Sequence, residues 1–231
     1  MAITLFEEQL RKKILVLDGA MGTMLQQANL SPEDFGGEEL EGCNENLVLT
    51  APEVIYQIHL EYLKAGADVI ETNTFGATPI VLDEYEIGSK AYEINKIAAE
   101  IAKRAVEDVS TSEWPRFVAG SLGPTTKTLS VTGGISFDAL VENYRVQAEG
   151  LLDGGVDVLL LETSQDALNV KAANLGIRTA FDSKGKEIPI LLSGTIEPMG
   201  TTLAGQTIEA FYLSLEHLNP LVVGLNCATG P

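Results

Sequence analysis

A regular alternation of short apolar segments with longer segments of helical period constrains the fold more than any other feature of the chain. The apolar segments, several of which run directly into polar exit residues, are residues 14–17, 68–76, 117–124, 157–164, 189–195 and 221–225. Between them, apolar residues recur at the spacing of one helix face, for example over 52–64, 90–109 and 136–153. Near-continuous apolar strands joined by helices are typical of parallel sheets. The sequence therefore predicts an α/β protein of about six strand-helix units.

Two of these units share a detailed pattern, which indicates that one structural unit is repeated. Residues 64–73 and 152–164 both pass from a helix end through glycine and aspartate into an apolar strand that finishes with Glu-Thr. Successive parallel units fit either a doubly wound open sheet or a (βα)8 barrel. No Gly-x-Gly-x-x-Gly or Walker-type loop follows the first strand, which favours the barrel. We expect a (βα)8 TIM-type barrel, truncated after about six units, as one domain over residues 1–231.

Charge and composition exclude several classes of partner. A formal net charge of −18 opposes binding to nucleic acid or anionic lipid, both of which require clustered Lys and Arg. No segment reaches the length of a membrane span, and the first residues lack the basic and apolar regions of a signal peptide. The two cysteines, Cys43 and Cys227, are far apart in sequence, which fits a reducing compartment. We predict a cytoplasmic protein that binds neither nucleic acid nor membranes.

Polar residues at the ends of the predicted strands point to one site. In a parallel barrel these ends meet at a single mouth. The residues that this reasoning places there are Asp18, Glu71, Thr72, Asn73, Ser121, Glu162, Thr163, Thr195, Glu197, Asn226 and Cys227. From local sequence alone, Asp18 would more often cap the next helix, and Cys227 would more often be a small buried hydrophobe. The polar, Gly-rich residues 30–46 are a candidate lid over the mouth.

Five motifs, in order along the chain, resemble the homocysteine S-methyltransferase family. They are LDGAMGT at 17–23, ETNTF at 71–75, GSLGP at 120–124, LET at 161–163 and GLNC at 224–227. Within that family they are most similar to the N-terminal homocysteine-binding barrel of cobalamin-dependent methionine synthases. The resemblance spans nearly the whole chain, and five ordered motifs are specific where any one of them would be weak.

The resemblance implies an activity, a metal and a second cofactor. Members of the family convert L-homocysteine to methionine, with the substrate thiolate bound to a zinc ion that three cysteine thiolates hold. By this resemblance Cys227 matches the first of these ligands and would be the catalytic residue, whereas the other two, an adjacent Cys-Cys pair, are expected beyond Pro231. The 231 residues alone are therefore expected to be inactive and to bind no zinc tightly. Methylcobalamin would be carried on a separate cobalamin-binding domain of a longer protein, which would also contain a folate-binding domain.

The resemblance also assigns residues to the groups of the substrate. Asp18 and Glu162 would hold the amino group, the backbone around Ala20 and Met21 with Thr72 would lie near the carboxylate, and Asn226 would complete the substrate site. The chemistry is consistent, because carboxylates neutralise an ammonium group and the N–H groups of a Gly-rich turn receive anions. Zinc would remove the thiol proton and leave a nucleophilic sulfur.

Two interpretations from other functional classes stay open. In one, a barrel enzyme uses carboxylate acid/base chemistry without metal, with Glu71 and Glu162 as the working pair and Cys227 inert. In the other, the mouth belongs to a non-catalytic module that binds an amino acid or a partner domain. Activity that survives Cys227→Ala would favour the first, and ligand binding without turnover under any methyl donor would favour the second.

Overall fold

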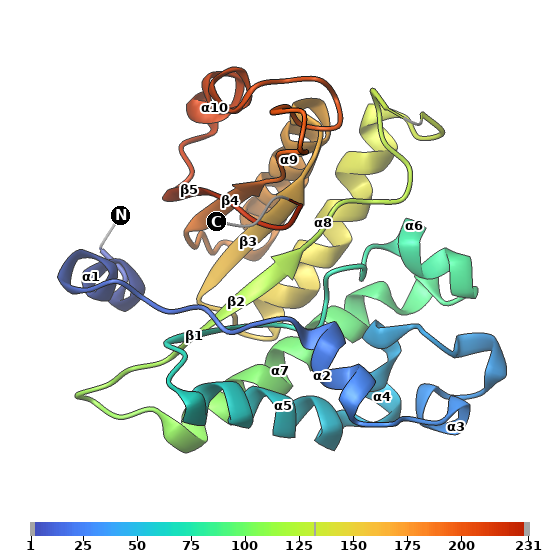
Figure 1. Cartoon of the computed structure of the whole chain (residues 1–231), viewed down its shortest axis with the longest axis vertical. Helices are drawn as coiled ribbons and strands as arrows, with labels where there is room; N and C mark the ends of the chain where they lie inside the picture. The colour runs from blue at the N-terminus through green and yellow to red at the C-terminus, as the bar shows by residue number, and fades with distance from the viewer. Residues whose placement is uncertain (1–2, 132, 229–231) are drawn as a thin grey trace.

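Five parallel strands form one sheet in the computed structural model, which describes residues 3–131 and 133–228 (Figure 1). The strands are β1 (Val69–Glu71), β2 (Phe117–Leu122), β3 (Val158–Ser164), β4 (Ile190–Gly194) and β5 (Val222–Leu225). Their order in the sheet is β1-β2-β3-β4-β5, and each neighbouring pair is parallel. The order lacks the reversal that defines a doubly wound sheet. The α/β class is confirmed, whereas closure into a barrel stays a prediction, because the sheet of the described residues ends at β5.

Residues 14–17, predicted as the first strand, form no regular strand. Leu17 makes one parallel bridge to Val69, and the N–H groups of Asp68 and Val69 donate to the carbonyl of Val16 at 2.8 and 3.1 Å. The N–H of Val16 donates instead to the side chain of Asp68, at 3.0 Å, so a carboxylate takes the place of a ladder partner. The segment lies beside β1 with its outer side open, and Ile14 is 89% exposed.

The helices lie mainly on one face of the sheet (Figure 1). They are α1 (Leu5–Lys12), α2 (Met21–Gln27), α3 (Pro32–Phe35), α4 (Leu47–Thr50), α5 (Pro52–Ala65), α6 (Pro79–Leu82), α7 (Ala91–Val109), α8 (Phe137–Asp153), α9 (Ala167–Lys184) and α10 (Ile208–Leu215), with 3-10 turns η1 (Glu38–Leu40), η2 (Asn44–Asn46), η3 (Asp83–Tyr85), η4 (Gly88–Lys90) and η5 (Glu216–Leu218). The predicted helices at 52–64, 90–109 and 136–153 are confirmed as α5, α7 and α8. Helix α5 ends at Gly66, whose φ of 114° is the left-handed conformation that glycine adopts readily. Within the described ranges, no helix combines the length and apolarity needed to cross a bilayer.

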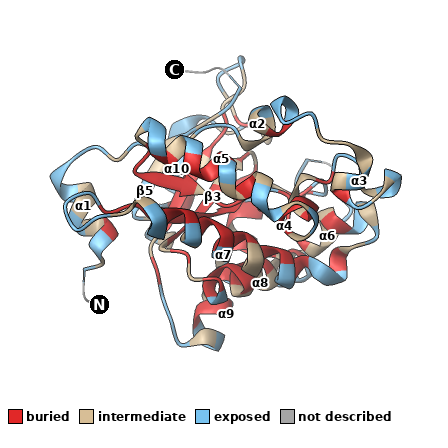
Figure 2. Ribbon diagram, turned by 90° about the horizontal axis from the view of Figure 1, so that it is seen from below, coloured by how far each residue is buried: buried red, intermediate tan, exposed pale blue. Residues whose placement is uncertain are grey.

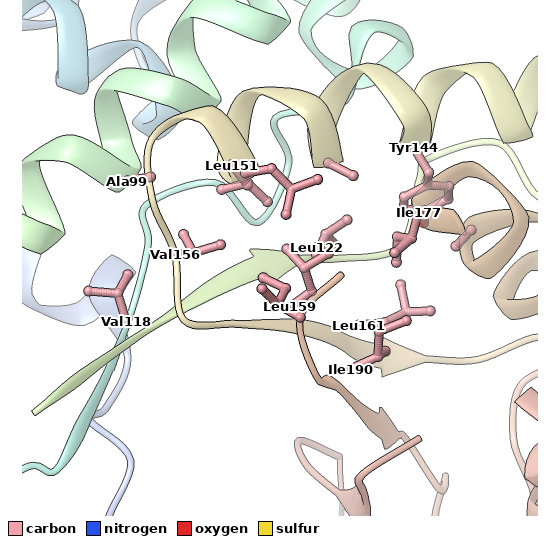
Figure 3. Packing of buried hydrophobic residues seen from close by; sticks show 14 of the residues in the cluster. Ala99, Val118, Leu122, Tyr144, Leu151, Val156, Leu159, Leu161, Ile177 and Ile190 are labelled. Atoms are coloured by element: carbon pink, nitrogen blue, oxygen red, sulfur yellow. The ribbon is translucent and has the colours of Figure 1, made fainter. Parts of the chain in front are cut away.

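Side chains alternate between the two faces of the sheet, and the larger core lies on the helix face. That core joins strand residues to helix residues (Figure 3), among them Val118, Leu122, Leu159, Leu161, Ile190, Leu151 and Ile177. Buried residues accordingly concentrate on the sheet and on the helix surfaces turned towards it (Figure 2). The opposite face carries a smaller cluster, in which the ring of Phe6 from α1 meets Phe117 edge-on with centroids 5.3 Å apart. Helix α1 therefore covers the amino-terminal end of this inner face.

The two aspartates of the repeated sequence pattern have equivalent structural roles. The carboxylate of Asp68 accepts the N–H of Val16 at 3.0 Å, and that of Asp157 accepts the N–H of Val118 at 2.8 Å. Each aspartate thus ties the start of its own strand to the segment that precedes it in the sheet. Asp68 also accepts a hydrogen bond from the ammonium group of Lys13 at 2.6 Å. The repeat noticed in the sequence is therefore a repeated connection at the amino-terminal rim of the sheet.

Candidate functional site

A cavity of about 470 Å³ opens at the carboxyl-terminal ends of the strands. Its lining consists of Asp18, Gly19, Ala20, Met21, Gly22, Asn44, Glu45, Glu71, Thr72, Asn73, Phe75, Ser121, Glu162, Thr163, Asn226 and Cys227. Nine of the eleven residues that the sequence placed at the mouth are in this lining, and Thr195 and Glu197 are not. Every residue that the family resemblance assigned to substrate or metal is included. Strand alternation explains the convergence, since Glu71, Ser121 and Glu162 continue the inner face of β1, β2 and β3.

Asp18 connects the segment after residue 17 to the end of β1 and faces the cavity. Its Oδ2 accepts the N–H of Glu71 at 3.0 Å, whereas its Oδ1 is buried without a hydrogen-bond partner among the described residues. Burial raises the pKa of Asp18 to about 7, and the N–H of Glu71 acts in the opposite direction. Helix α2 has Ala20 as its N-cap with no side-chain cap, so the alternative in which Asp18 caps that helix is wrong. Asp18 therefore brings to the cavity lining one carboxyl oxygen that has no donor among the described residues.

Glu162 lies at the centre of a group of donors and acceptors on β1, β2 and β3. The hydroxyl of Ser121 donates to its Oε1 at 2.6 Å, and the hydroxyl of Thr163 donates to its Oε2 at 3.3 Å. Glu71, at the end of β1, lines the same cavity as Glu162. Burial first, and then the charges of Glu162 and Asp18, raise the pKa of Glu71 to about 9. Asp18 and Glu71 therefore both keep their protons to a higher pH than exposed carboxyl groups do.

The turn at residues 19–22 forms the opposite wall. A Cβ added at Gly19 would lie 3.0 Å from the hydroxyl of Tyr62, so the turn approaches α5 closely. That hydroxyl donates to the carbonyl of Ala20 at 3.3 Å. Because α2 begins at Met21 without a side-chain cap, the N–H groups of its first turn are available to a ligand.

The side chain of Asn226 makes four hydrogen bonds, one of them to the sulfur of Cys227. Its Oδ1 accepts the N–H of Thr163 at 3.1 Å and the hydroxyl of Ser193 at 2.5 Å. Its Nδ2 donates to the Thr163 hydroxyl at 2.8 Å and to the Cys227 sulfur at 3.3 Å. Thr163 and Cys227 both have positive φ, 54° and 60°, which is uncommon outside glycine. The exposed thiol is thus presented to the cavity by an amide that joins β3, β4 and the residues after β5.

Thr72, expected near a substrate carboxylate, lines the cavity with its hydroxyl already engaged. The hydroxyls of Thr72 and Thr74 are 2.6 Å apart, and the N–H of Ser121 donates to the Thr72 hydroxyl at 3.0 Å. The side chain is buried at 4% exposure. Its geometry therefore fixes β1 against β2 at the rim of the cavity.

Residues 30–46, predicted as a candidate lid over the mouth, form one wall of the cavity, and sequence reasoning missed their two lining residues, Asn44 and Glu45. These residues fold into α3, η1 and η2, and Glu45 and Asn44 line the cavity. The Oε1 of Glu45 accepts the N–H of Gly76 at 2.8 Å, and the carbonyl of Asn44 accepts the amide of Asn73 at 2.7 Å. The predicted lid is therefore a wall bonded to the exit of β1. The Asn44-Glu45 pair carried no recognisable signal within a polar loop.

The described residues supply one candidate metal ligand at the cavity. Over residues 3–131 and 133–228, no group of three His, Cys, Asp or Glu side chains is placed to hold a metal ion. Cys43 packs in an apolar cluster with Phe35 and Leu47, and burial raises the pKa of its thiol to about 11. The ligands expected beyond Pro231 lie outside the described residues. Cys227 alone therefore represents the predicted site, and the described donor set does not complete it.

The chain matches the family model for homocysteine S-methyltransferase over residues 15–231. Its fold is similar to that of crystal structures of the homocysteine methyltransferase MmuM from Escherichia coli. The metallated form has a TM-score of 0.78 and 23% identity, with 96% of this chain and 77% of that chain covered. The oxidised form has a TM-score of 0.77 and 24% identity, with 94% and 75% covered. Because the family match extends over nearly all of the sequence, the chain belongs to the homocysteine S-methyltransferase family.

Proposed function

We propose that the cavity binds L-homocysteine for transfer of a methyl group to its sulfur, which gives methionine. The proposal deepens the family assignment, and one observation carries it: the orphaned Oδ1 of Asp18 and the carboxylate of Glu162 line one cavity with an exposed thiol, that of Cys227. We also propose that residues 1–231 form a single homocysteine-binding domain whose sheet is part of a (βα)8 barrel.

The charges of the cavity favour a cationic group. Its described lining contains four carboxyl groups, those of Asp18, Glu45, Glu71 and Glu162, and neither Lys, Arg nor His. An α-ammonium group near Asp18 and Glu162 would give the buried Asp18 Oδ1 the donor that it lacks. This is the role expected for the two residues in an amino-acid site.

The carboxylate of the same amino acid would lie against the turn at residues 19–22. This wall carries no acidic side chain, and the backbone N–H groups at the start of α2 have no side-chain acceptor. Ala20 and Met21 would therefore contribute through the backbone, while Thr72 would shape the rim between them and β2. Carboxyl groups of Asp18 and Glu162 on one side and the N–H groups of the turn at residues 19–22 on the other would orient a zwitterionic amino acid in one direction.

The homocysteine sulfur would then point towards Cys227, where the proposal includes zinc. A zinc ion at this thiolate would remove the proton from the substrate thiol and hold the nucleophilic sulfur. The described residues provide only Cys227 of the three thiolates required, so two further ligands would have to come from elsewhere. Asn226 fits such a site, because its amide orients the sulfur of Cys227 before any ligand arrives. Methylcobalamin on a separate domain, with a folate-binding domain in the same protein, remains part of the proposal as the methyl source.

Carboxylate acid/base chemistry is the second candidate function. The observation that favours it is that Glu71 and Glu162 line one cavity, in which burial and the charge of Glu162 raise the pKa of Glu71 to about 9. Activity of the complete protein that persists in Cys227→Ala would support this candidate against methyl transfer through a thiolate site.

Isothermal titration calorimetry with L-homocysteine tests the proposed substrate site. Asp18→Asn and Glu162→Gln should each weaken binding by about 1–3 kcal/mol, the usual cost of losing a hydrogen bond to a charged group. Glu197→Gln is the matched control, because Glu197 follows β4 at the same rim but does not line the cavity. Unchanged affinity in both cavity variants would remove Asp18 and Glu162 from the substrate site.

A further inference from the structure

Ser121 is the cavity residue that connects β2 to the carboxylate of Glu162, and the proposed substrate site gives it no role of its own. Its hydroxyl donates to the Oε1 of Glu162 at 2.6 Å. Ser121 is 2% exposed, so its backbone groups are out of reach of bulk solvent and need partners within the protein. The direction of its hydroxyl therefore depends on how those backbone groups are held.

Side chains hold the backbone of Ser121, because β1 ends before it can supply a partner. The register of the β1–β2 pair stops at Glu71 and Ala119. Beyond that point the N–H of Ser121 donates to the hydroxyl of Thr72 at 3.0 Å, and its carbonyl accepts the hydroxyl of Thr74 at 2.7 Å. Hydrogen bonds from side chains thus replace the backbone ladder at this point of the sheet.

A third side chain, that of Gln147 on α8, reaches the same place from outside the cavity. Its Nε2 donates to the carbonyl of Thr74 at 2.7 Å and to the carbonyl of Ser121 at 3.3 Å. Gln147 is fully buried and is not among the residues that line the cavity. One amide thus bridges the exit of β1 and the end of β2, and it fixes the distance between these two segments at the rim.

The cost of Gln147 to the fold indicates more than a packing role. Its Oε1 is buried without a hydrogen-bond partner among the described residues. A buried oxygen without a donor lowers stability, and such costs are expected at functional sites rather than at ordinary core positions. The two carbonyls that it contacts each have another donor, the N–H of Ala77 for Thr74 and the hydroxyl of Thr74 for Ser121. Satisfying these carbonyls therefore does not require Gln147.

We infer that Gln147 is a positioning residue for the ammonium group of the substrate. It holds the peptide of Ser121 so that the Ser121 hydroxyl stays on one oxygen of Glu162 and fixes the orientation of that carboxylate. The inference rests on the proposed function, because it assumes that the ammonium group binds at Glu162. Since hydrogen bonds between charged groups depend on geometry, a displaced Ser121 should weaken ligand binding although every carboxylate of the cavity is still present.

Titration calorimetry with L-homocysteine on Gln147→Met measures this effect. Methionine has nearly the volume of glutamine but no donor, and each carbonyl keeps its other partner, so the variant should fold. We expect the dissociation constant to rise about tenfold, as it also should in Ser121→Ala. Asn95→Leu is the matched control, because Asn95 is a fully buried amide on α7 that donates to the carbonyl of Ala77, farther along the same loop. This control should lower the free energy of unfolding and leave the dissociation constant unchanged.

A double variant that combines Gln147→Met with Ser121→Ala shows whether Gln147 acts through Ser121. If it does, the double variant should bind L-homocysteine no more weakly than Ser121→Ala alone, because the path through Ser121 is already lost. Independent effects would instead multiply to about a hundredfold loss. Multiplied losses, or an unchanged dissociation constant in Gln147→Met, would overturn the inference.

Carbon-13 NMR of the ligand-free protein separates this inference from the proposed function. The side-chain carboxyl resonance of Glu162, assigned through Glu162→Gln, should shift in both Ser121→Ala and Gln147→Met and keep its position in Asn95→Leu. If it shifts but the unmodified protein binds no L-homocysteine, the proposed function and the effect on affinity are both wrong, whereas the coupling of Gln147 to Glu162 is supported. A resonance that keeps its position in Gln147→Met would overturn the inference even if L-homocysteine binds well.

Discussion

Replacement of His59 by leucine should stabilise the protein and remove a pH dependence of its unfolding. His59 is fully buried on α5, and neither ring nitrogen has a hydrogen-bond partner among the described residues. Burial lowers its pKa from 6.5 to about 4. A buried polar group without a partner costs about 1–3 kcal/mol, so we expect His59→Leu to raise the free energy of unfolding at neutral pH by that order.

The magnitude of the pH effect follows from the two pKa values. Because the folded pKa is lower than the unfolded value, the unfolded state binds the proton first as the pH falls through 6.5. The protein therefore loses stability on acidification, by about 2 kcal/mol at about pH 5 and about 3 kcal/mol once the pH is below about 4. Above about pH 7 both states are neutral, and this contribution vanishes.

Urea unfolding followed by circular dichroism, between about pH 5 and about pH 7.5, measures this contribution as the difference between the protein and His59→Leu. The difference should grow towards low pH, because other titrating groups are common to both proteins. His217→Gln provides a matched control at the second histidine, which is exposed. A difference that stays constant with pH would show that His59 acquires its proton in the folded state, and the reasoning from burial would be wrong.

Three further predictions concern other parts of the chain. A thiol-specific reagent should modify the exposed Cys227 rapidly and the buried Cys43 only on unfolding, which a colorimetric thiol count in native and denaturing buffer measures. Asp68→Ala should cost about 3–5 kcal/mol in urea unfolding, because it leaves the buried Arg116 without its carboxylate partner. Light scattering should show association that rises with protein concentration and is reduced by Leu225→Lys, because an open apolar edge invites pairing.

Each of these predictions has a contradicting result. Two thiols of equal reactivity in the folded protein would deny the difference in burial. Asp108 serves as the control, because its carboxylate makes an exposed hydrogen bond with Tyr56. If Asp68→Ala lowered the free energy of unfolding no more than Asp108→Ala does, water would be solvating the guanidinium group of Arg116 in the variant, and the predicted cost would be wrong. A protein that stays monomeric at all concentrations would show that the edge at β5 is protected.

The parts of the fold that the sequence predicted are those set by periodicity. Apolar runs and helical spacing located β2 to β5 and the long helices, because burial on the helix face of a parallel sheet requires those patterns. The convergence of Glu71 and Glu162 also followed, since parallel strands end at one rim. Predictions that depend only on strand direction and side-chain alternation therefore agree with the structure.

The parts that could not be predicted depend on contacts between distant residues. Residues 14–17 have the composition of a strand, but only Leu17 forms a bridge to β1, and the N–H of Val16 donates to the carboxylate of Asp68, distant in sequence. Local sequence favoured Asp18 as a helix cap, whereas its carboxylate accepts the N–H of Glu71, far along the chain. Glu45 reaches the cavity only because its loop is bonded to the exit of β1. Such side-chain to backbone bonds leave no periodic trace in the sequence.

Cys227 lies directly after β5, so its mobility depends on how readily this end of the sheet opens. β5 is an edge strand with no buried residue, and Leu225 is 58% exposed. Edge strands with few buried contacts open at lower free energy than central ones, so amides of β5 should exchange with solvent earlier than those of β3. The three hydrogen bonds from the Asn226 side chain to Thr163 on β3 and Ser193 on β4 oppose that fraying. A segment that covered the outer side of β5 would therefore slow hydrogen exchange of the β5 backbone amides. Because the side-chain amide of Asn226 contacts the Cys227 sulfur, it would also restrict the positions that this sulfur can occupy.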